Sequence, residues 1–255
     1  MSEVLLSPYS IALLFFIIAF VYSSVGLGGG SSYTAMMAVL GFSTLAIPMV
    51  SLSLNMLVTA VGSFNYIRHK HARLNLILPF LVTSIPFAYL GGALQLDKLT
   101  FYWVLLISLC FVAARIYLWR DTRIQLQLSG RGKLIVSLVS GSILGFVAGI
   151  AGIGGGIYLV PLIIILGLGT VKEAAASGVI FIFINSVTGL ISRLQYNMID
   201  LTEYLPLLLA VLLGGILGSH VGAVKYSAKT LEKLLGVIIL LAIVLLARKL
   251  LLNMG

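Results

Sequence analysis

The sequence has no charged residue between Glu3 and Arg68, a stretch of 64 residues. A second charge-free stretch of 38 residues separates Lys133 from Lys172. One helix needs about 20 apolar residues to cross a bilayer, so these stretches hold several crossings. Soluble proteins carry about 25 % charged residues on average, whereas this chain has 9 % and a mean hydropathy of +1.17. We therefore predict an all-α, polytopic membrane protein with the lipid bilayer as its solvent.

Charge and cysteine content exclude several other classes. The net charge of +9 does not indicate a nucleic-acid partner, because the basic residues lie in short loops between apolar spans, where they encode membrane topology. The single Cys110 lies within an apolar segment, so we expect neither a disulfide framework nor a metal cluster. The first charge is Glu3 where a signal peptide would carry a basic region, so no cleavable signal is expected.

The chain contains an internal repeat. Residues 25–44 read VGLGGGSSYTAMMAVLGFST, and residues 151–170 read AGIGGGIYLVPLIIILGLGT. The matching positions, all 126 residues apart, are Gly26, Gly28, Gly29, Gly30, Gly41 and Thr44 with Gly152, Gly154, Gly155, Gly156, Gly167 and Thr170. Ser51 and Ser177 keep the same offset. Ordered matches of this kind indicate two related halves.

Hydropathy predicts five helical segments in each half. In the first half they cover 9–26, 30–42, 46–67, 76–93 and 100–119, and in the second 133–150, 156–168, 171–193, 203–222 and 230–251. The polar, basic stretch 120–132 separates them. We therefore expect a first transmembrane repeat at 1–119, a cytoplasmic linker at 120–132 and a second transmembrane repeat at 133–255. Thr170 and Glu173 have the spacing of a capping box at the start of the eighth segment.

Lysine and arginine positions predict the topology. If segments alternate in direction, one face holds the loops after the third, fifth and ninth segments, with Arg68, Lys70, Arg73, Arg120, Arg123, Arg131, Lys133, Lys225, Lys229 and Lys233. The other face holds Lys98, Arg193, Arg248 and Lys249. The positive-inside rule assigns the first set to the cytoplasm, with both termini outside. Five segments are an odd number, so the halves are expected to be inverted relative to each other, as in many transporters.

The second and seventh segments are too short to span a bilayer. About 12 residues of helix reach about 18 Å, against a hydrocarbon core of about 30 Å. A triple glycine precedes or opens each one, so the first amides of each helix are left unpaired at the positive end of its dipole. We interpret these broken helices as an anion cradle of backbone N–H groups, to which Ser31 and Ser32 add hydroxyls. The alternative is that these glycines only allow close helix packing.

Polar residues within the spans are further candidates to line a path. Ser51, Ser53 and Asn55 lie on the third segment, and Ser177, Asn185 and Ser186 on the eighth. Each asparagine is either a link between helices or a ligand contact. The predicted substrate-binding residues are Gly28, Gly29, Gly30, Ser31, Ser32, Ser51, Asn55, Gly154, Gly155, Gly156, Ser177 and Asn185.

The paired G-x-G-G-G motifs, the stretch from Leu166 to Gly178 and the downstream Asn185 resemble the TauE/SafE sulfite-exporter family of bacterial and archaeal permeases. The resemblance covers about residues 10–250. Its motif maps onto Gly26, Gly28, Gly29, Gly30, Gly152, Gly154, Gly155 and Gly156, and onto Ala174 to Gly178. The first half departs from it, because Ala46-Ile47-Pro48 stands where the second half has Lys172-Glu173. The resemblance implies a prokaryotic plasma or inner membrane and export of sulfite, a sulfonate or a related anion, without a cofactor.

We therefore predict a transporter that exports sulfite or a related organosulfur anion. The alternative within this class is an importer of sulfur oxyanions or of small carboxylates. An enzyme is not expected, because all seven acidic residues fall at segment ends or in loops and no His/Cys/Asp cluster could hold a catalytic metal.

Overall fold

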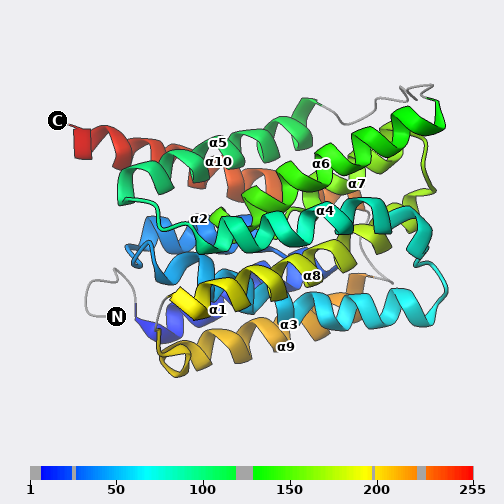
Figure 1. The fold of residues 1–255 in the computed structure, drawn as a ribbon. Helices are drawn as coiled ribbons and strands as arrows, with labels where there is room; N and C mark the ends of the chain where they lie inside the picture. The colour runs from blue at the N-terminus through cyan, green and yellow to red at the C-terminus, as the bar shows by residue number, and fades with distance from the viewer. Residues whose placement is uncertain (1–6, 25–26, 119–128, 197–198, 223–227, 255) are drawn as a thin grey trace.

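The computed structural model describes residues 7–24, 27–118, 129–196, 199–222 and 228–254, and these residues form helices and short connections without a strand (Figure 1). The helices are α1 (Pro8–Ser24), α2 (Gly30–Leu40), α3 (Ala46–Arg68), α4 (Leu74–Ala93), α5 (Lys98–Leu118), α6 (Gly130–Ala151), α7 (Gly156–Ile165), α8 (Val171–Tyr196), the 3₁₀ turn η1 (Leu201–Tyr204), α9 (Leu205–Gly222) and α10 (Ala228–Met254). The predicted all-α class is confirmed. Most of the predicted linker, and Gly26, lie outside the described residues.

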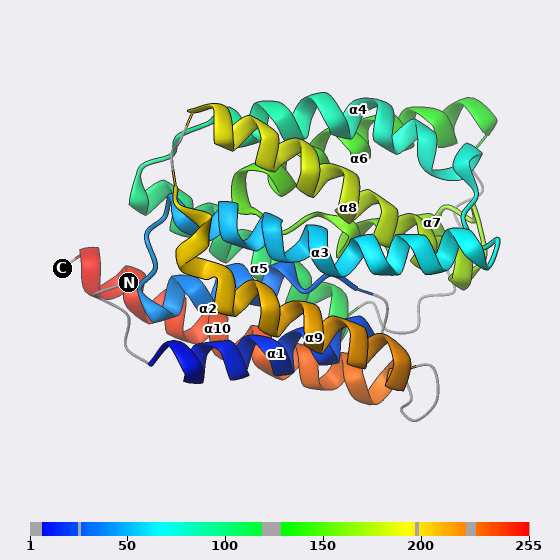
Figure 2. The ribbon, with the colours of Figure 1, turned by 90° about the horizontal axis from the view of Figure 1, so that it is seen from below.

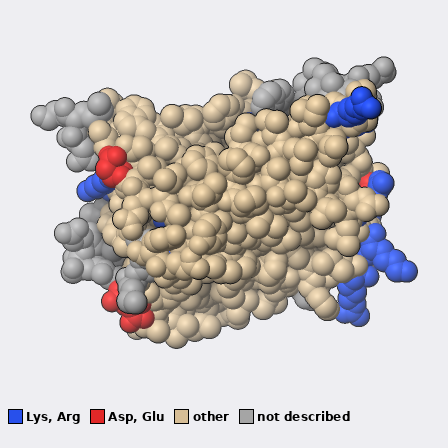
Figure 3. Space-filling view, in the orientation of Figure 1, with Lys and Arg blue, Asp and Glu red and all other residues tan. Residues whose placement is uncertain are grey.

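Six helices within the described ranges are long and apolar enough to cross a membrane. They are α3, α4, α5, α6, α8 and the segment Leu201–Ser219. Large apolar side chains such as Val82, Phe111, Ile143 and Val244 are exposed midway along their helices. Figure 3 shows this uncharged surface extending between two ends that carry the charged groups. Exposed apolar faces of this extent require lipid as solvent, so the protein is a multi-pass membrane protein.

The charged residues of the described ranges lie at the two ends of the bundle. Arg68, Lys70 and Arg73 lie where α3 meets α4, at what we name the basic end. Asp97, Asp200 and Glu203 lie at the other end, where α1 begins and α10 ends, and which we name the terminal end (Figures 1 and 3). The terminal end also carries Lys98, Arg193, Arg248 and Lys249.

The short helices α2 and α7 have 11 and 10 residues, about 16 Å of helix each. Both end earlier than the sequence predicts, at Leu40 and Ile165. The cause is a glycine in the left-handed region near each end, Gly41 with φ 92° and Gly167 with φ 59°, which a continuing helix does not permit. The prediction of two helices too short to span a bilayer is confirmed.

Helices from the two chain halves are interleaved. The first helix α1 packs along α9, α4 packs along α6, and α3 packs along α8 in the middle of the bundle. Figure 2 shows α4, α6 and α8 on one side of α3, with α1, α2, α9 and α10 on the other. In the internal repeat, α1 corresponds to α6 and α4 corresponds to α9. The α1–α9 pair is therefore equivalent to the α6–α4 pair. Inversion of the halves across a membrane, and the domain boundaries, stay predictions.

Glycines bring several helix backbones into contact. Gly141, Gly145 and Gly149 on α6 face the backbone of α4, and a Cβ on Gly145 would lie 2.6 Å from Ser84 Cα. Gly214 on α9 likewise faces the Phe16 backbone of α1. Small residues at every fourth position permit this approach in membranes. These glycines are therefore packing positions.

The eighth helix begins with the predicted capping box. The N–H of Thr170 donates to Glu173 Oε2 over 2.7 Å, and the N–H of Glu173 donates to Thr170 Oγ1 over 3.3 Å. Arg73 also bonds Glu173 over 3.2 Å, linking the start of α4 to the start of α8 at the basic end. The structural role predicted for Glu173 is confirmed.

Candidate functional site

The two glycine loops meet inside the bundle. A Cβ added to Gly30, the first residue of α2, would lie 2.6 Å from the carbonyl oxygen of Ile153 in the other loop. From this meeting point α2 runs towards the terminal end and α7 towards the basic end (Figure 2). Two broken helices therefore begin close together and lead in opposite directions.

Asn55 on α3 lies between the two loops and is fully buried. Its Oδ1 would lie 2.8 Å from a Cβ on Gly28, and its Nδ2 would lie 3.3 Å from a Cβ on Gly154. A Cβ on Gly30 would collide with the same Nδ2. The absence of side chains at these three glycines is thus what lets one asparagine touch both loops.

Ser51, one turn before Asn55 on α3, joins the loops by hydrogen bonds. Its hydroxyl lies 2.8 Å from the Gly152 carbonyl oxygen and 3.4 Å from that of Gly30. Asn55 Nδ2 donates to the same Gly152 oxygen over 3.3 Å. One face of α3 therefore donates hydrogen bonds to backbone carbonyl groups of both glycine loops.

The backbone of the loops adopts conformations that favour glycine. Gly29 has φ 87°, and a Cβ there would lie 2.7 Å from the ring of Tyr33. Gly155 has φ 75°, with Phe181 at 3.0 Å from the position of a Cβ. These two glycines shape the loops, whereas the contacts with Asn55 come from Gly28, Gly30 and Gly154.

Backbone amides at the start of α7 have no hydrogen-bond acceptor within the described ranges. Those of Gly156 and Ile157 are among them, because the first bond into the helix is from Tyr158 to Gly155 O. At the start of α2 the amide N–H of Ser31 also has no acceptor within the described ranges, whereas the amide N–H of Ser32 donates to Gly29 O. Free amides of this kind carry the positive end of a helix dipole.

The eighth helix closes the other side of the site. Ile182 contacts the loops at Gly28 and Gly154, and the Gly178 carbonyl lies 2.5 Å from the position of a Cβ on Gly156. Contacts of Leu52 with Gly189 and of Gly62 with Val179 set the antiparallel register of α3 and α8.

This register places Asn55 level with Ser186. Asn55 Oδ1, Asn185 Oδ1, Ser177 Oγ and Ser186 Oγ are all buried and have no hydrogen-bond partner within the described part of the chain. Buried polar atoms nearly always have partners, so the unpartnered atoms of Asn55, Asn185 and Ser186 at one depth suit a site that binds a polar ligand, whereas Ser177 lies more than two turns away along α8. Asn185 Nδ2 is bonded within its own helix, to Phe181 O.

Ser31 and Ser32 turn towards α1. Both hydroxyls bond the phenol oxygen of Tyr22, at 2.9 Å and 2.8 Å. Their predicted contribution to an anion cradle stays a prediction. Ser53, another candidate, bonds Met49 O within its own helix.

Sequence reasoning did not identify Tyr22, Thr59 or Ile182 as part of this region, although a Cβ on Gly28 would lie 2.9 Å from the Thr59 methyl group. Thr59 stands one turn after Asn55 on the same helix face, a spacing that could have indicated it. Tyr22 and Ile182 have no such signal, because their positions depend on how α1 and α8 dock.

Arg193 is the largest departure from the sequence reading, which grouped it with loop charges of the outer face. Its side chain is only 5 % exposed. Nη2 donates to Gly149 O over 2.9 Å and to Ile150 O over 2.7 Å, and Nε donates to Gly149 O over 3.2 Å. These are carbonyls of the last turn of α6, just before the Gly152 loop.

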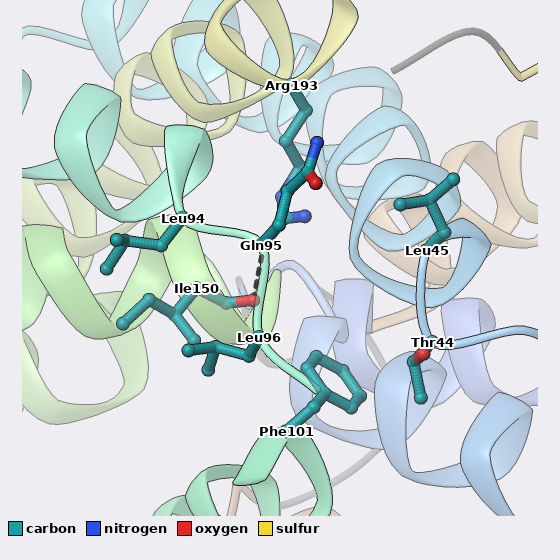
Figure 4. A pocket seen from close by; sticks show the side chains of 8 residues that line it. All are labelled: Thr44, Leu45, Leu94, Gln95, Leu96, Phe101, Ile150 and Arg193. Carbon is teal, nitrogen blue, oxygen red and sulfur yellow. Dashed lines mark hydrogen bonds between the residues drawn. The ribbon is translucent and has the colours of Figure 1, made fainter. Parts of the chain in front are cut away.

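A pocket of about 40 Å³ adjoins this arginine at the terminal end (Figure 4). Its lining residues are Thr44, Leu45, Leu94, Gln95, Leu96, Phe101, Ile150 and Arg193. Figure 4 shows Arg193 extending from α8 towards Gln95 and Ile150. No group of three His, Cys, Asp or Glu side chains that could hold a metal occurs among the described residues.

Comparisons with known proteins identify relatives among membrane transporters. The chain is 33 % identical to the probable membrane transporter protein y4hK of Sinorhizobium fredii over 238 residues, which cover 91 % of this chain and 95 % of that protein. It is 27 % identical to the probable membrane transporter protein MJ0441 of Methanocaldococcus jannaschii over 190 residues, 71 % of this chain and 70 % of that protein. No solved structure matches the chain. The profile of the sulfite exporter TauE/SafE family matches residues 11–246, and the chain therefore belongs to this family of membrane transporters.

Proposed function

We propose that this transporter exports a small oxyanion, sulfite or a related organosulfur anion, through the site between the two glycine loops. The observation that carries the proposal is the meeting of two helix N-termini at Asn55. Two positive dipole ends that face each other repel unless negative charge lies between them. A bound anion supplies that charge and accepts hydrogen bonds from the free amides.

The polar side chains suit an oxyanion as well. Ser177 and Ser186 have hydroxyls that can donate to a ligand oxygen. The Nδ2 groups of Asn55 and Asn185 each donate one hydrogen to a backbone carbonyl and keep a second for a ligand oxygen. The surrounding apolar packing, with Ile182 against both loops, excludes water and strengthens each of these bonds.

Charge distribution supports the direction of insertion. The basic end carries more Lys and Arg residues than the terminal end, which has Lys98, Arg248 and Lys249; those of the basic end are Arg68, Lys70, Arg73, Arg131, Lys133 and Lys172. By the positive-inside rule the basic end faces the cytoplasm and both termini lie outside, in the plasma or inner membrane of a prokaryote. With α7 leading inward and α2 leading outward, the central site lies between a cytoplasmic and an external route.

The test is anion flux into proteoliposomes, with sulfite, sulfate, a simple sulfonate and a small carboxylate compared. We expect saturable flux of a sulfur oxyanion, reduced about tenfold to a hundredfold in Asn55→Ala, since a hydrogen bond to a charged group contributes about 1.5–3 kcal/mol. Ser53→Ala is the matched control, because that buried hydroxyl on the same helix bonds only its own backbone.

Flux equal to that of empty liposomes for every anion would exclude the proposal. A preference for the carboxylate, or loading that occurs only in the inward direction, would favour the alternative of an importer. Equal losses in Asn55→Ala and Ser53→Ala would show that the glycine-loop site is not the route.

A further inference from the structure

Tyr33 on α2 has a buried hydroxyl group without a hydrogen-bond partner within the described ranges. Its side chain is fully buried. The other residues of α2 that carry a hydroxyl group are Ser31, Ser32 and Thr34, and all three form side-chain hydrogen bonds. A buried hydroxyl group without an acceptor costs free energy on folding. The exception at Tyr33 therefore calls for a reason outside the folding of the helix.

This hydroxyl group lies at the N-terminal end of α2. Long side chains on a helix point back towards its N-terminus, and Tyr33 reaches Gly29, the residue that precedes the helix. Its oxygen lies 2.8 Å from the position of a Cβ on Gly29, a space that glycine leaves open. The amide N–H of Ser31 in the same turn also lacks an acceptor within the described ranges. A phenol donor and a free amide thus lie at the positive end of one helix dipole.

The first glycine loop lies between Tyr33 and Asn55. Gly29 meets the phenol, whereas the glycines on either side of it meet the Asn55 side chain. Phe15 on α1 stacks on the Tyr33 ring, with 5.6 Å between the ring centroids and an interplanar angle of 14°, and so fixes its position. The hydroxyl group is therefore one residue of loop backbone away from the contacts that define the central site.

The second half has no equivalent hydroxyl group. The offset of 126 residues in the internal repeat places Leu159 at the position equivalent to Tyr33. The tyrosine of the second short helix is Tyr158, and its hydroxyl group donates to Ser108 O over 2.7 Å. The start of α2 therefore offers a hydroxyl donor that the start of α7 lacks, and the two glycine loops differ in their chemistry.

We propose that Tyr33 is a substrate-binding residue, whose hydroxyl group donates a hydrogen bond to the anion held at the N-terminus of α2. An oxyanion provides the acceptor for this buried group, and a hydrogen bond to a charged acceptor is stronger than one to a neutral acceptor. Because the second loop has no such donor, the central site is asymmetric and holds the anion more tightly at the first loop. This inference rests on the proposed function for the identity of the anion.

The experiment compares Tyr33→Phe with Tyr158→Phe, the same substitution on the other short helix. Phenylalanine retains the ring that stacks on Phe15 and removes only the hydroxyl group. Each purified protein is unfolded thermally in detergent over a range of sodium sulfite or sodium ethanesulfonate concentrations, with sodium chloride added to constant ionic strength. The rise of the unfolding midpoint with anion concentration gives the dissociation constant without any transport.

Without either sulfur anion, Tyr33→Phe should be at least as stable as the wild type, because the substitution breaks no hydrogen bond. Tyr158→Phe should lower the midpoint, because it removes the bond to Ser108 O. With the anion, Tyr33→Phe should raise the dissociation constant about tenfold or more, the effect of one hydrogen bond to a charged group. Tyr158→Phe should keep the wild-type dissociation constant.

An unchanged dissociation constant in Tyr33→Phe would overturn the inference, and this is also the result expected if a water molecule rather than the anion accepts the hydrogen bond. A lower midpoint or a failure of Tyr33→Phe to fold would overturn it too, since the hydroxyl group would then have a structural role. If neither anion stabilises the wild type, both the inference and the proposed function are wrong. Stabilisation that depends on Tyr33 in a protein without anion flux in liposomes would contradict the proposed function alone.

Discussion

The Ser51 hydroxyl donates to the carbonyl oxygen of Gly152, a residue 101 positions away in the chain, over 2.8 Å. Asn55 donates to the same oxygen over 3.3 Å. Gly152 follows the last residue of α6 and has φ 74°, so no following helical turn supplies an N–H donor to its carbonyl oxygen. Two side chains of the first half thus satisfy a backbone group at the broken point of the second.

Because the two donors share one acceptor, their removal should be non-additive. Ser51→Ala or Asn55→Ala alone leaves Gly152 O with a partner, and each should cost about 0.6 kcal/mol, the average for such bonds in membranes. The double variant leaves a buried carbonyl without a partner, which costs about 1–3 kcal/mol. Thermal unfolding of the purified variants in detergent measures the difference. Strictly additive losses would show that the two bonds act independently.

Gly29 should be intolerant of a side chain because it combines a positive φ with a close aromatic neighbour. An L-residue there costs about 1–2 kcal/mol in backbone energy, and its Cβ would meet the Tyr33 ring. We expect Gly29→Ala, and Gly155→Ala for the same reason, to reduce transport at normal abundance in the membrane. Gly130→Ala is the control, with no atom near its Cβ position. Wild-type flux in both loop variants would mean that the glycines serve packing alone.

The helices could be predicted from sequence because apolar length and glycine breaks are local properties. The start of α8 was predicted for the same reason, as Thr170 and Glu173 cap it within one turn. The site residues are harder to predict from sequence. The sequence indicates Asn55 as a candidate but not its position between the two glycine loops, and it does not indicate that Arg193 is buried. Its burial follows from the end of α6 packing beside α8, a contact between segments 43 and 44 residues apart that no local pattern encodes.

The α4–α6 contact should fail when its central glycine is enlarged. A valine at Gly145 would push its side chain into the Ser84 backbone, and overpacking of this kind costs about 1–3 kcal/mol. We expect Gly145→Val to lower the unfolding temperature and the yield of monodisperse protein. Gly130→Val should behave as wild type, and equal stability of the two variants would contradict the packing role of Gly145.

Transport should carry net charge. Asp97, Glu173, Asp200 and Glu203 lie at helix ends or between helices, and Glu232 lies near the start of α10, so none of these acidic residues stands midway along a helix where it could relay protons. A potential negative inside drives an anion outward by about 2.3 kcal/mol per charge per 100 mV. Flux should therefore follow a valinomycin-clamped potential. Electroneutral flux that follows a pH gradient and disappears in His220→Ala would contradict this expectation; the His220 side chain lies outside the described residues.

The interleaving of helices also constrains how the protein is made. The ribosome completes α1 long before α9, its packing partner. Ser51 is likewise synthesised long before Gly152, whose carbonyl accepts its hydrogen bond. Until then the first half sits in the bilayer with polar groups that have only lipid, water or an insertion factor to contact. Neither half should form a stable unit when expressed alone, whereas two halves produced together from a chain cut in the linker should assemble. Membrane insertion and folding are then separate events, and the second can begin only when translation is nearly finished.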